Sequence, residues 1–168
     1  MGKRKTVSKS QLKAANYILE RMQTAMALDF IGLISTEDHL VTVHSNTVIV
    51  DTDVLASLAA SSFAATKQLV QEIDEPDYTL MFHEGSHLNI HISQISEDML
   101  LLICFHMPTQ LGKVRWMTRQ ALGVLASALD RNSKPLKPGD GGSEGYVTDA
   151  KKAIDRLFES GEEESGIN

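Results

Sequence analysis

The chain has 168 residues, of which 42% are apolar and 23% charged, a composition typical of a globular protein with enough length for one core. Its formal net charge of −6 argues against nucleic acid as the main partner, because phosphate binding requires an excess of Lys and Arg. The single cysteine, Cys104, excludes an intrachain disulfide and favours a reducing, cytoplasmic location with a buried, inert thiol. No apolar run has the length of a membrane span, so we expect none.

The N-terminal part predicts a helix followed by a β-hairpin. A basic tail, residues 1–9, precedes a helix that Ser8 or Ser10 can cap and that ends near Leu28. Residues 30–35 and 40–45 are predicted strands, joined by a polar turn at 37–39. The apolar side of the first helix comprises Leu12, Ala15, Ile18, Leu19, Met22, Ala25 and Met26.

A long central helix is predicted over residues 51–73, with Asp51, Thr52 and Asp53 as N-cap candidates. Residues at three- and four-residue steps form a mostly apolar stripe that is predicted to face the core: Leu55, Leu58, Ser62, Thr66, Leu69 and Ile73. The other side carries mainly small residues: Ala56, Ser57, Ala60, Ser61, Ala64, Ala65 and Gln68. This side has two interpretations. In the first, the helix is buried on both sides or is simply rich in Ala because Ala favours helices; in the second, the helix docks a protein.

Three strands and a helix follow. Residues 78–82 form the first strand, and Leu88, Ile90 and Ile92 alternate with polar residues, which predicts a strand buried on one face. Residues 99–105 are apolar throughout and predict a central strand covered on both faces. A helix capped by Thr109 comes last, and its predicted inner side comprises Leu111, Val114, Met117, Ala121, Leu125, Ala128 and Leu129. The order α-ββ-α-βββ-α, with hairpin connections, predicts a five-stranded antiparallel sheet covered by helices, over residues 10–131.

The C-terminal part predicts a linker and a short helix. Residues 132–145 are rich in Gly and Pro, residues 146–160 form a helix capped by Thr148, and residues 161–168 are an acidic tail. Ile154, Leu157 and Phe158 lie on one face of this helix. Because a helix this short needs to dock, it either folds back onto its own domain or is presented to a partner, and the length of the linker favours the second interpretation.

No catalytic constellation, cofactor motif or phosphate-binding loop is visible. His83, His87 and His91 invite a metal hypothesis, but residues four apart on a strand lie roughly 13 Å apart, too far to share one ion. We therefore predict no metal, no cofactor and no active site of its own. An enzyme or metal protein that uses these histidines remains the third hypothesis, and metal analysis of the purified protein tests it.

Several short motifs, in order along nearly the whole chain, resemble the roadblock/LC7 family, and in particular its MglB-like bacterial branch. They are Asp51-Thr52, Leu55-Ala56-Ser57-Leu58, Ala64-Ala65, Phe82-His83-Glu84-Gly85, Leu111-Gly112, Val114-Arg115, Ile154-Asp155 and Leu157-Phe158. The resemblance implies a profilin-like α/β sandwich that forms a homodimer, with the sheets joined edge to edge and the central helices side by side.

The resemblance also implies a partner, a Ras-like small GTPase of the MglA type, whose GTP hydrolysis the family's MglB-like members accelerate. It places a GTPase-binding surface on the central helix, at Ser57, Ala60, Ser61, Ala64, Lys67 and Gln68. It places a second contact in the C-terminal helix, at Ile154, Leu157 and Phe158. Because the central helix has no arginine, and the resemblance puts Arg115 and Arg119 on the other side of the sheet, we predict activation without an arginine finger. The alternative is a roadblock-type scaffold in a motor or polarity complex that does not alter hydrolysis.

Overall fold

The computed structural model describes residues 7–37, 40–46, 51–75, 77–106, 111–130 and 142–164, with side chains in the last range at 145 and 147–159. The predicted turn residues Asp38 and His39 and the predicted cap Thr109 lie outside these ranges. The chain forms two compact units, Met26–Val114, and Met1–Ala25 together with Arg115–Asn168.

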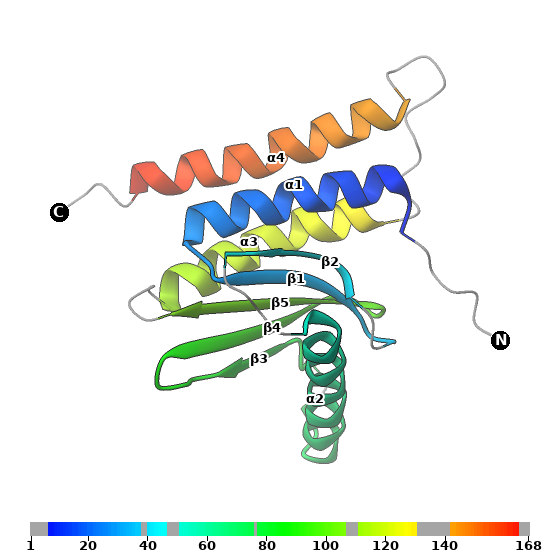
Figure 1. The fold of residues 1–168 in the computed structure, drawn as a ribbon, viewed down its shortest axis with the longest axis vertical. Coiled ribbons are helices and arrows are strands. Elements are labelled where there is room, and N and C mark those ends of the chain that lie inside the picture. Colours follow the sequence, from blue (N-terminus) through cyan, green and yellow to red (C-terminus); the bar gives the residue numbers. More distant parts are fainter. Residues whose placement is uncertain are drawn as a thin grey trace. The chain divides into compact units, whose positions relative to one another are not determined.

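The first unit is built on a five-stranded sheet in the order β2-β1-β5-β4-β3, in which every neighbouring pair is antiparallel (Figure 1). Its strands are β1 (Phe30–Ser35), β2 (Leu40–Ser45), β3 (Leu80–His83), β4 (Leu88–Ser96) and β5 (Met99–His106). β5 lies at the centre, and its residues from Met99 to Phe105 are all buried, which confirms the predicted central strand. The predicted α-ββ-α-βββ-α order is confirmed as well.

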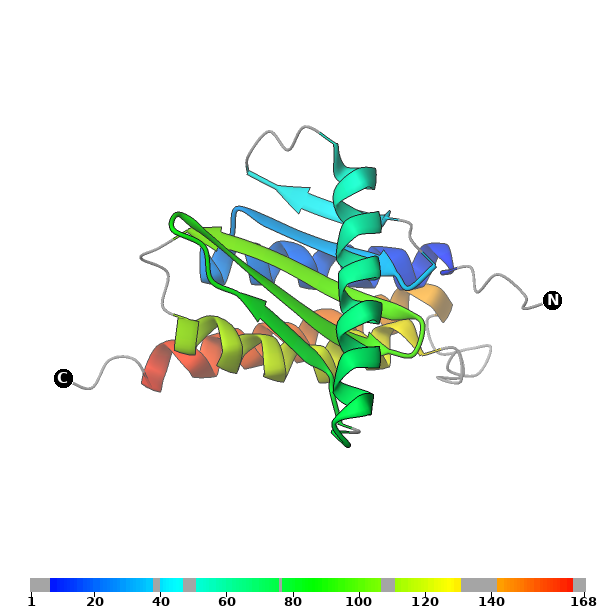
Figure 2. The same ribbon diagram turned by 90° about the horizontal axis from the view of Figure 1, so that it is seen from below.

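The helix α2 (Thr52–Glu72) crosses one face of this sheet (Figure 2). Asp51 caps it as predicted, since its carboxylate accepts hydrogen bonds from the backbone N–H groups of Asp53 (3.1 Å) and Val54 (3.0 Å). The prediction of its core-facing side, however, is wrong, because Leu58, Leu69 and Ile73 are exposed. The buried residues of α2 are Ala56, Ala59, Ala60 and Phe63.

The reason for this reversal is the closeness of α2 to the sheet. Three alanines face the strands, where short side chains let the helix backbone approach, and Phe63 fills the remaining space beside Met81 and Ile92. Helical spacing of large apolar residues predicts that one stripe will be covered, but it does not say whether the chain's own sheet or another protein covers it. The stripe of α2 that the sequence assigns to the core is thus left on the surface of this chain.

The strand β4 also differs from its prediction. Asn89, His91 and Ser93 alternate with the apolar residues, as the sequence requires, but all three are buried, so the strand is not buried on one face alone. Each of the three takes part in a hydrogen bond: Asn89 Oδ1 accepts from the N–H of Gly85 at 3.3 Å, and His91 Nε2 lies 2.6 Å from Ser93 Oγ. Hydrogen bonds of this kind make the burial of polar side chains tolerable, and a polarity pattern does not reveal them.

The second unit is helical and contains α1 (Lys9–Met26), α4 (Gly142–Glu164) and all but the first four residues of α3 (Leu111–Leu129). Ser8 caps α1 as predicted, since its Oγ accepts from the N–H of Gln11 at 3.2 Å while Gln11 Oε1 accepts from the N–H of Ser8 at 2.9 Å. The inner sides predicted for α1 and α3 are confirmed at their centres, where Ile18, Leu19 and Leu125 are buried.

The C-terminal helix is longer than predicted. α4 begins at Gly142, inside the predicted linker 132–145, and ends at Glu164, beyond the predicted end at 160. Thr148 therefore lies within the helix and does not cap it. Residues 131–141 lie outside the described ranges. The glycines at 142 and 145 lower helix propensity, but the packing of the residues that follow outweighs that cost.

Candidate functional site

The exposed side of α2 consists of two strips of different chemistry. At about 100° per residue, the strips are separated by roughly a quarter of a turn of the helix. The first, called here the apolar flank, comprises Val54, Leu58, Ala65, Leu69 and Ile73. The second, called here the small-residue flank, comprises Ser57, Ser61, Ala64 and Gln68.

The apolar flank exposes large side chains to an unusual degree. Leu58, Leu69 and Ile73 are 61%, 64% and 70% exposed, and Val54 is exposed beside them. Single exposed apolar residues are common on protein surfaces, but several in a row along one helix mark a protein interaction surface. The apolar flank is therefore the strongest sign of a docking surface on this unit.

The C-terminal half of α2 lies against a free edge of the sheet. Thr66 Oγ1 lies 3.5 Å from Met81 Sδ of β3, and the Phe63 ring lies 5.2 Å from the ring of Tyr78 just before that strand. Within the described sheet β3 is an edge strand, so its outer backbone N–H and C=O groups are not used by another strand. A partner that covers Leu69, one turn after Thr66, can therefore also pair with the backbone groups of this edge.

The small-residue flank contains four of the six residues that the sequence places at the GTPase contact. Ser61, Ala64 and Gln68 are exposed, and Ser57 is half-buried. Ala60 is only 4% exposed and packs in the core beneath α2, so it does not belong to this surface. Lys67 is half-buried and donates from Nζ to Gln94 Oε1 of β4 at 3.3 Å, which places it at the border of the helix and the sheet.

The C-terminal helix is docked within its own unit. Ile154 and Phe158 are buried, Leu157 is half-buried, and Val147, in an earlier turn, is buried too. α4 lies beside α1 in the structure, and the two helices are joined by side-chain contacts (Figure 1). The apolar face predicted to reach a partner is thus already covered, which favours the interpretation that the sequence analysis ranked second.

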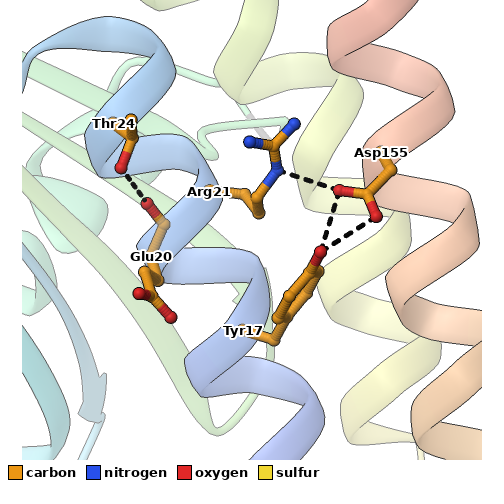
Figure 3. A network of polar contacts seen from close by, with 5 residues as sticks. All are labelled: Tyr17, Glu20, Arg21, Thr24 and Asp155. Carbon is orange, nitrogen blue, oxygen red and sulfur yellow. Dashed lines mark hydrogen bonds and ion pairs between the residues drawn. The ribbon is translucent and has the colours of Figure 1, made fainter.

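A polar network joins α4 to α1 at Asp155 (Figure 3). Its carboxylate accepts from Tyr17 Oη at 2.9 and 3.1 Å, one distance to each oxygen, and from Arg21 Nε at 2.8 Å. Lys151 Nζ lies 4.6 Å from the centre of the Tyr17 ring, so a cation also covers the ring face. Mainly because the Tyr17 hydroxyl donates to this carboxylate, the pKa of Tyr17 is raised above 10.0.

The sequence analysis did not single out Tyr17, Arg21 and Asp155 as a group. Tyr17 and Arg21 are four residues apart on α1 and therefore share a face, and Asp155 directly follows the apolar residue Ile154. Those spacings are visible in the sequence, but more than 130 residues separate the two segments. Only the packing of α4 on α1 makes them neighbours.

The other groups considered for chemistry are separated or shielded. Burial raises the pKa of the Cys104 thiol to about 12, so it is not a thiolate at neutral pH. His83 and His87 are exposed while His91 is fully buried, and the described residues hold no cluster of three metal-ligating side chains. Among the helices that the structure describes, none is long and apolar enough to cross a membrane.

Known structures of similar fold include MglB proteins. The gliding protein MglB from Thermus thermophilus superposes with a TM-score of 0.68 and 21% identity, over 77% of this chain and 98% of that chain. Myxococcus xanthus MglB superposes with a TM-score of 0.68 and 23% identity, over 76% of this chain and 99% of that chain. An MglB in a tetrameric arrangement superposes with a TM-score of 0.69 and 22% identity, over 77% of this chain and 97% of that chain. At these identities the likeness establishes the fold, and the comparison with curated proteins gives no match.

Sequence comparison with protein families identifies one domain. The profile of the roadblock/LC7 domain matches residues 18–105, which is more than half of the chain and includes α2 and almost the whole sheet. Both flanks of α2 and the β3 edge lie inside this match, whereas α4 lies outside it. The chain belongs to the roadblock/LC7 family.

Proposed function

We propose that this protein is a homodimeric regulator of a Ras-like small GTPase of the MglA type and that it accelerates GTP hydrolysis. The observation that carries the proposal is the exposed side of α2, where an apolar flank and a small-residue flank lie next to each other inside the family domain. The similar MglB folds and the sequence motifs support the choice of partner.

The two flanks suit two different partners. Leu58, Leu69 and Ile73 require permanent cover, so we assign the apolar flank, with the β3 edge, to a second copy of the chain. Antiparallel pairing of two β3 edges would bring two α2 helices side by side. We assign Ser57, Ser61, Ala64 and Gln68 to the GTPase, because short side chains let its switch loops approach closely.

The chemistry of activation must come mainly from the GTPase. α2 contains no arginine, and Lys67, its only cation, is turned towards Gln94. We therefore infer that docking positions the switch loops and the attacking water, and that no arginine finger is inserted. Replacing Arg115 and Arg119 by Ala should leave the stimulation unchanged, whereas a loss of stimulation with binding preserved would contradict this mechanism.

The C-terminal helix has to be released before it can contact the GTPase with its apolar face. Ile154 and Phe158 are buried in the docked state, so each contact they make with a partner replaces one they make within this chain. The affinity that α4 adds is then reduced by its docking free energy. This equilibrium lets α4 tune binding or nucleotide exchange without providing the main contact.

The decisive experiment measures GTP hydrolysis by the Ras-like GTPase of the same genome, alone, with the full chain and with a chain that ends at Arg131. Stimulation by both forms supports the proposal, and a difference between them measures the contribution of α4. Binding without stimulation would support the alternative function, a roadblock-type scaffold. Absence of binding to the GTPase would contradict the proposal, and the family relationship would then describe the fold alone.

A single substitution tests the GTPase surface. Ala64→Arg places a long cation on the small-residue flank, at an exposed position where the side chain does not disturb the core. We expect GTPase binding to fall by about a hundredfold or more while the dimer persists, because a desolvated, unpaired charge is costly at an interface. Ala65→Arg, one residue further on the apolar flank, is the matched variant and should weaken the dimer instead. Normal GTPase binding by Ala64→Arg would refute the assignment.

A further inference from the structure

We propose that the exposed face of α3 formed by Arg115, Trp116 and Arg119 is a second docking surface, which binds an acidic segment of another protein. This surface, called here the α3 cationic face, shares no residue with α2 or α4. The inference is therefore independent of the GTPase proposal and extends beyond it.

The exposure of Trp116 is the first observation. It is the only tryptophan in the chain, and 46% of its surface is exposed, although the opposite side of α3 is buried through Met117, Ala121 and Leu125. Nearly half of the surface of this large side chain is thus left uncovered in the isolated chain. Trp and Arg are among the residues most enriched at positions that carry binding energy in protein interfaces.

The charge around Trp116 is the second observation. Arg115 and Arg119 are exposed and four residues apart on one helix face, where like charges oppose helix formation. α3 contains no Asp or Glu in its whole length, and no ion pair joins either arginine to a carboxylate of the described residues. In a chain of net charge −6, this face thus carries positive charge that no carboxylate of the described residues pairs with.

The helix surface beyond Trp116 is open. Gly123 lies two turns further along the same face, is exposed, and has nothing within 4 Å of the position a Cβ would take. A glycine inside a helix lowers its stability, and here no neighbouring atom in the described structure requires it. Because Gly123 has no side chain, another backbone can lie along α3 next to the tryptophan.

An acidic protein segment fits these features better than a membrane does. The planar guanidinium groups of Arg115 and Arg119 can each bind a carboxylate through two parallel hydrogen bonds, and an apolar side chain beside the carboxylates can cover Trp116. Stable attachment to an anionic membrane requires larger clusters of cations, and the net charge of −6 opposes it at long range. Charge complementarity therefore points to a protein partner rich in Asp and Glu.

Trp116 provides its own assay, because all tryptophan emission comes from this surface. The full chain is titrated with a short synthetic peptide in which pairs of Glu alternate with Leu, and with its Gln counterpart. We expect the Glu peptide to shift Trp116 emission to the blue, with an affinity that falls as salt rises, and the Gln peptide to have no effect. No shift with the Glu peptide would overturn the proposal.

A charge-matched pair of variants localises the binding. Arg115→Glu combined with Arg119→Glu should weaken peptide binding by about tenfold or more. Lys13→Glu combined with Lys152→Glu changes the net charge equally at exposed sites on α1 and α4 and should leave binding intact. An equal loss of peptide affinity in both double variants would mean that binding depends on net charge alone, and the proposal would fail. Circular dichroism verifies that both variants are folded.

Two further arms address other occupants of the face. A response of Trp116 to phosphatidylserine vesicles, but not to the Glu peptide or to phosphatidylcholine vesicles, would replace the protein partner by a membrane and overturn the proposal. A blue or red shift on removal of residues 159–168, with no peptide present, would show that the chain's own acidic end occupies the face, which also overturns it. Unchanged stimulation of the GTPase by the Arg115 and Arg119 double variant keeps this result separate from the proposed function.

Discussion

The hydrogen bond from Tyr17 to Asp155 predicts a specific dependence on pH. Its donation to the carboxylate raises the pKa of Tyr17 in the folded protein above the ordinary 10.0. The stabilisation it contributes is therefore complete below pH 10.0 and is lost as the pH rises through the folded pKa. In an absorbance titration of tyrosinate, Asp155→Asn should shift one of the three tyrosines to lower pH, and Tyr17→Phe should remove that transition. An unchanged titration in Asp155→Asn would contradict the bond.

Gly85 is a position at which the addition of one carbon atom is expected to lower the stability of the fold. It lies in the turn between β3 and β4, and an added Cβ would come within 2.3 Å of the Leu88 carbonyl oxygen, which is backbone and cannot rotate away. We expect Gly85→Ala to lower the free energy of unfolding by about 1–3 kcal/mol. Gly123→Ala is the control with the opposite sign, because α3 is open there and Ala favours a helix by about 0.5–1 kcal/mol. Urea unfolding measures both variants.

At the scale of elements, α4 is held by a buried apolar strip and one carboxylate. Asp155→Asn weakens the hydrogen bonds from Tyr17 and Arg21 but keeps the size of the side chain. Because Arg21 and Asp155 are about a third exposed, solvent screens the ion pair, and we expect a cost on the order of 1 kcal/mol. Amide hydrogen exchange across 142–164 should then become about fivefold faster.

The matched control for this experiment is Asp149→Asn, which removes an exposed carboxylate from the same helix. Exchange in α4 should remain at the wild-type rate in that variant. If Asp155→Asn behaved like Asp149→Asn, the network at Asp155 would not be what holds α4, and the apolar residues Val147, Ile154 and Phe158 would account for its docking alone.

For the whole molecule, the exposed stripe of α2 predicts assembly. Leu69→Arg places a charge in the middle of the proposed contact between two copies, where it would be buried without a partner. We expect sedimentation equilibrium to show a dimer for the wild-type chain and for Ala64→Arg, but a monomer for Leu69→Arg. A wild-type monomer at micromolar concentration, or a dimer that tolerates Leu69→Arg, would refute the assignment of the apolar flank.

Much of this architecture follows from local sequence patterns. Asp51 and Ser8 cap helices because of chemistry within three residues, and the unbroken apolar run at 99–105 forms a central strand because such residues need cover on both faces. The antiparallel pairs β1-β2, β3-β4 and β4-β5 follow from short connections, and the family from motifs spaced along the chain. These features depend on residues close together in sequence, or on the order of elements.

Which surface each side chain faces was decided by the tertiary structure. Leu58 and Leu69 form an apolar stripe in the sequence, but α2 turns its alanines to the sheet because short side chains allow the closest packing, so the stripe lies outside. Asp155 is an ordinary polar residue of α4 until α1 brings Tyr17 and Arg21 beside it. Periodicity determines which residues share a face, whereas the partner of that face depends on contacts between distant segments, and those contacts exist only in the folded chain.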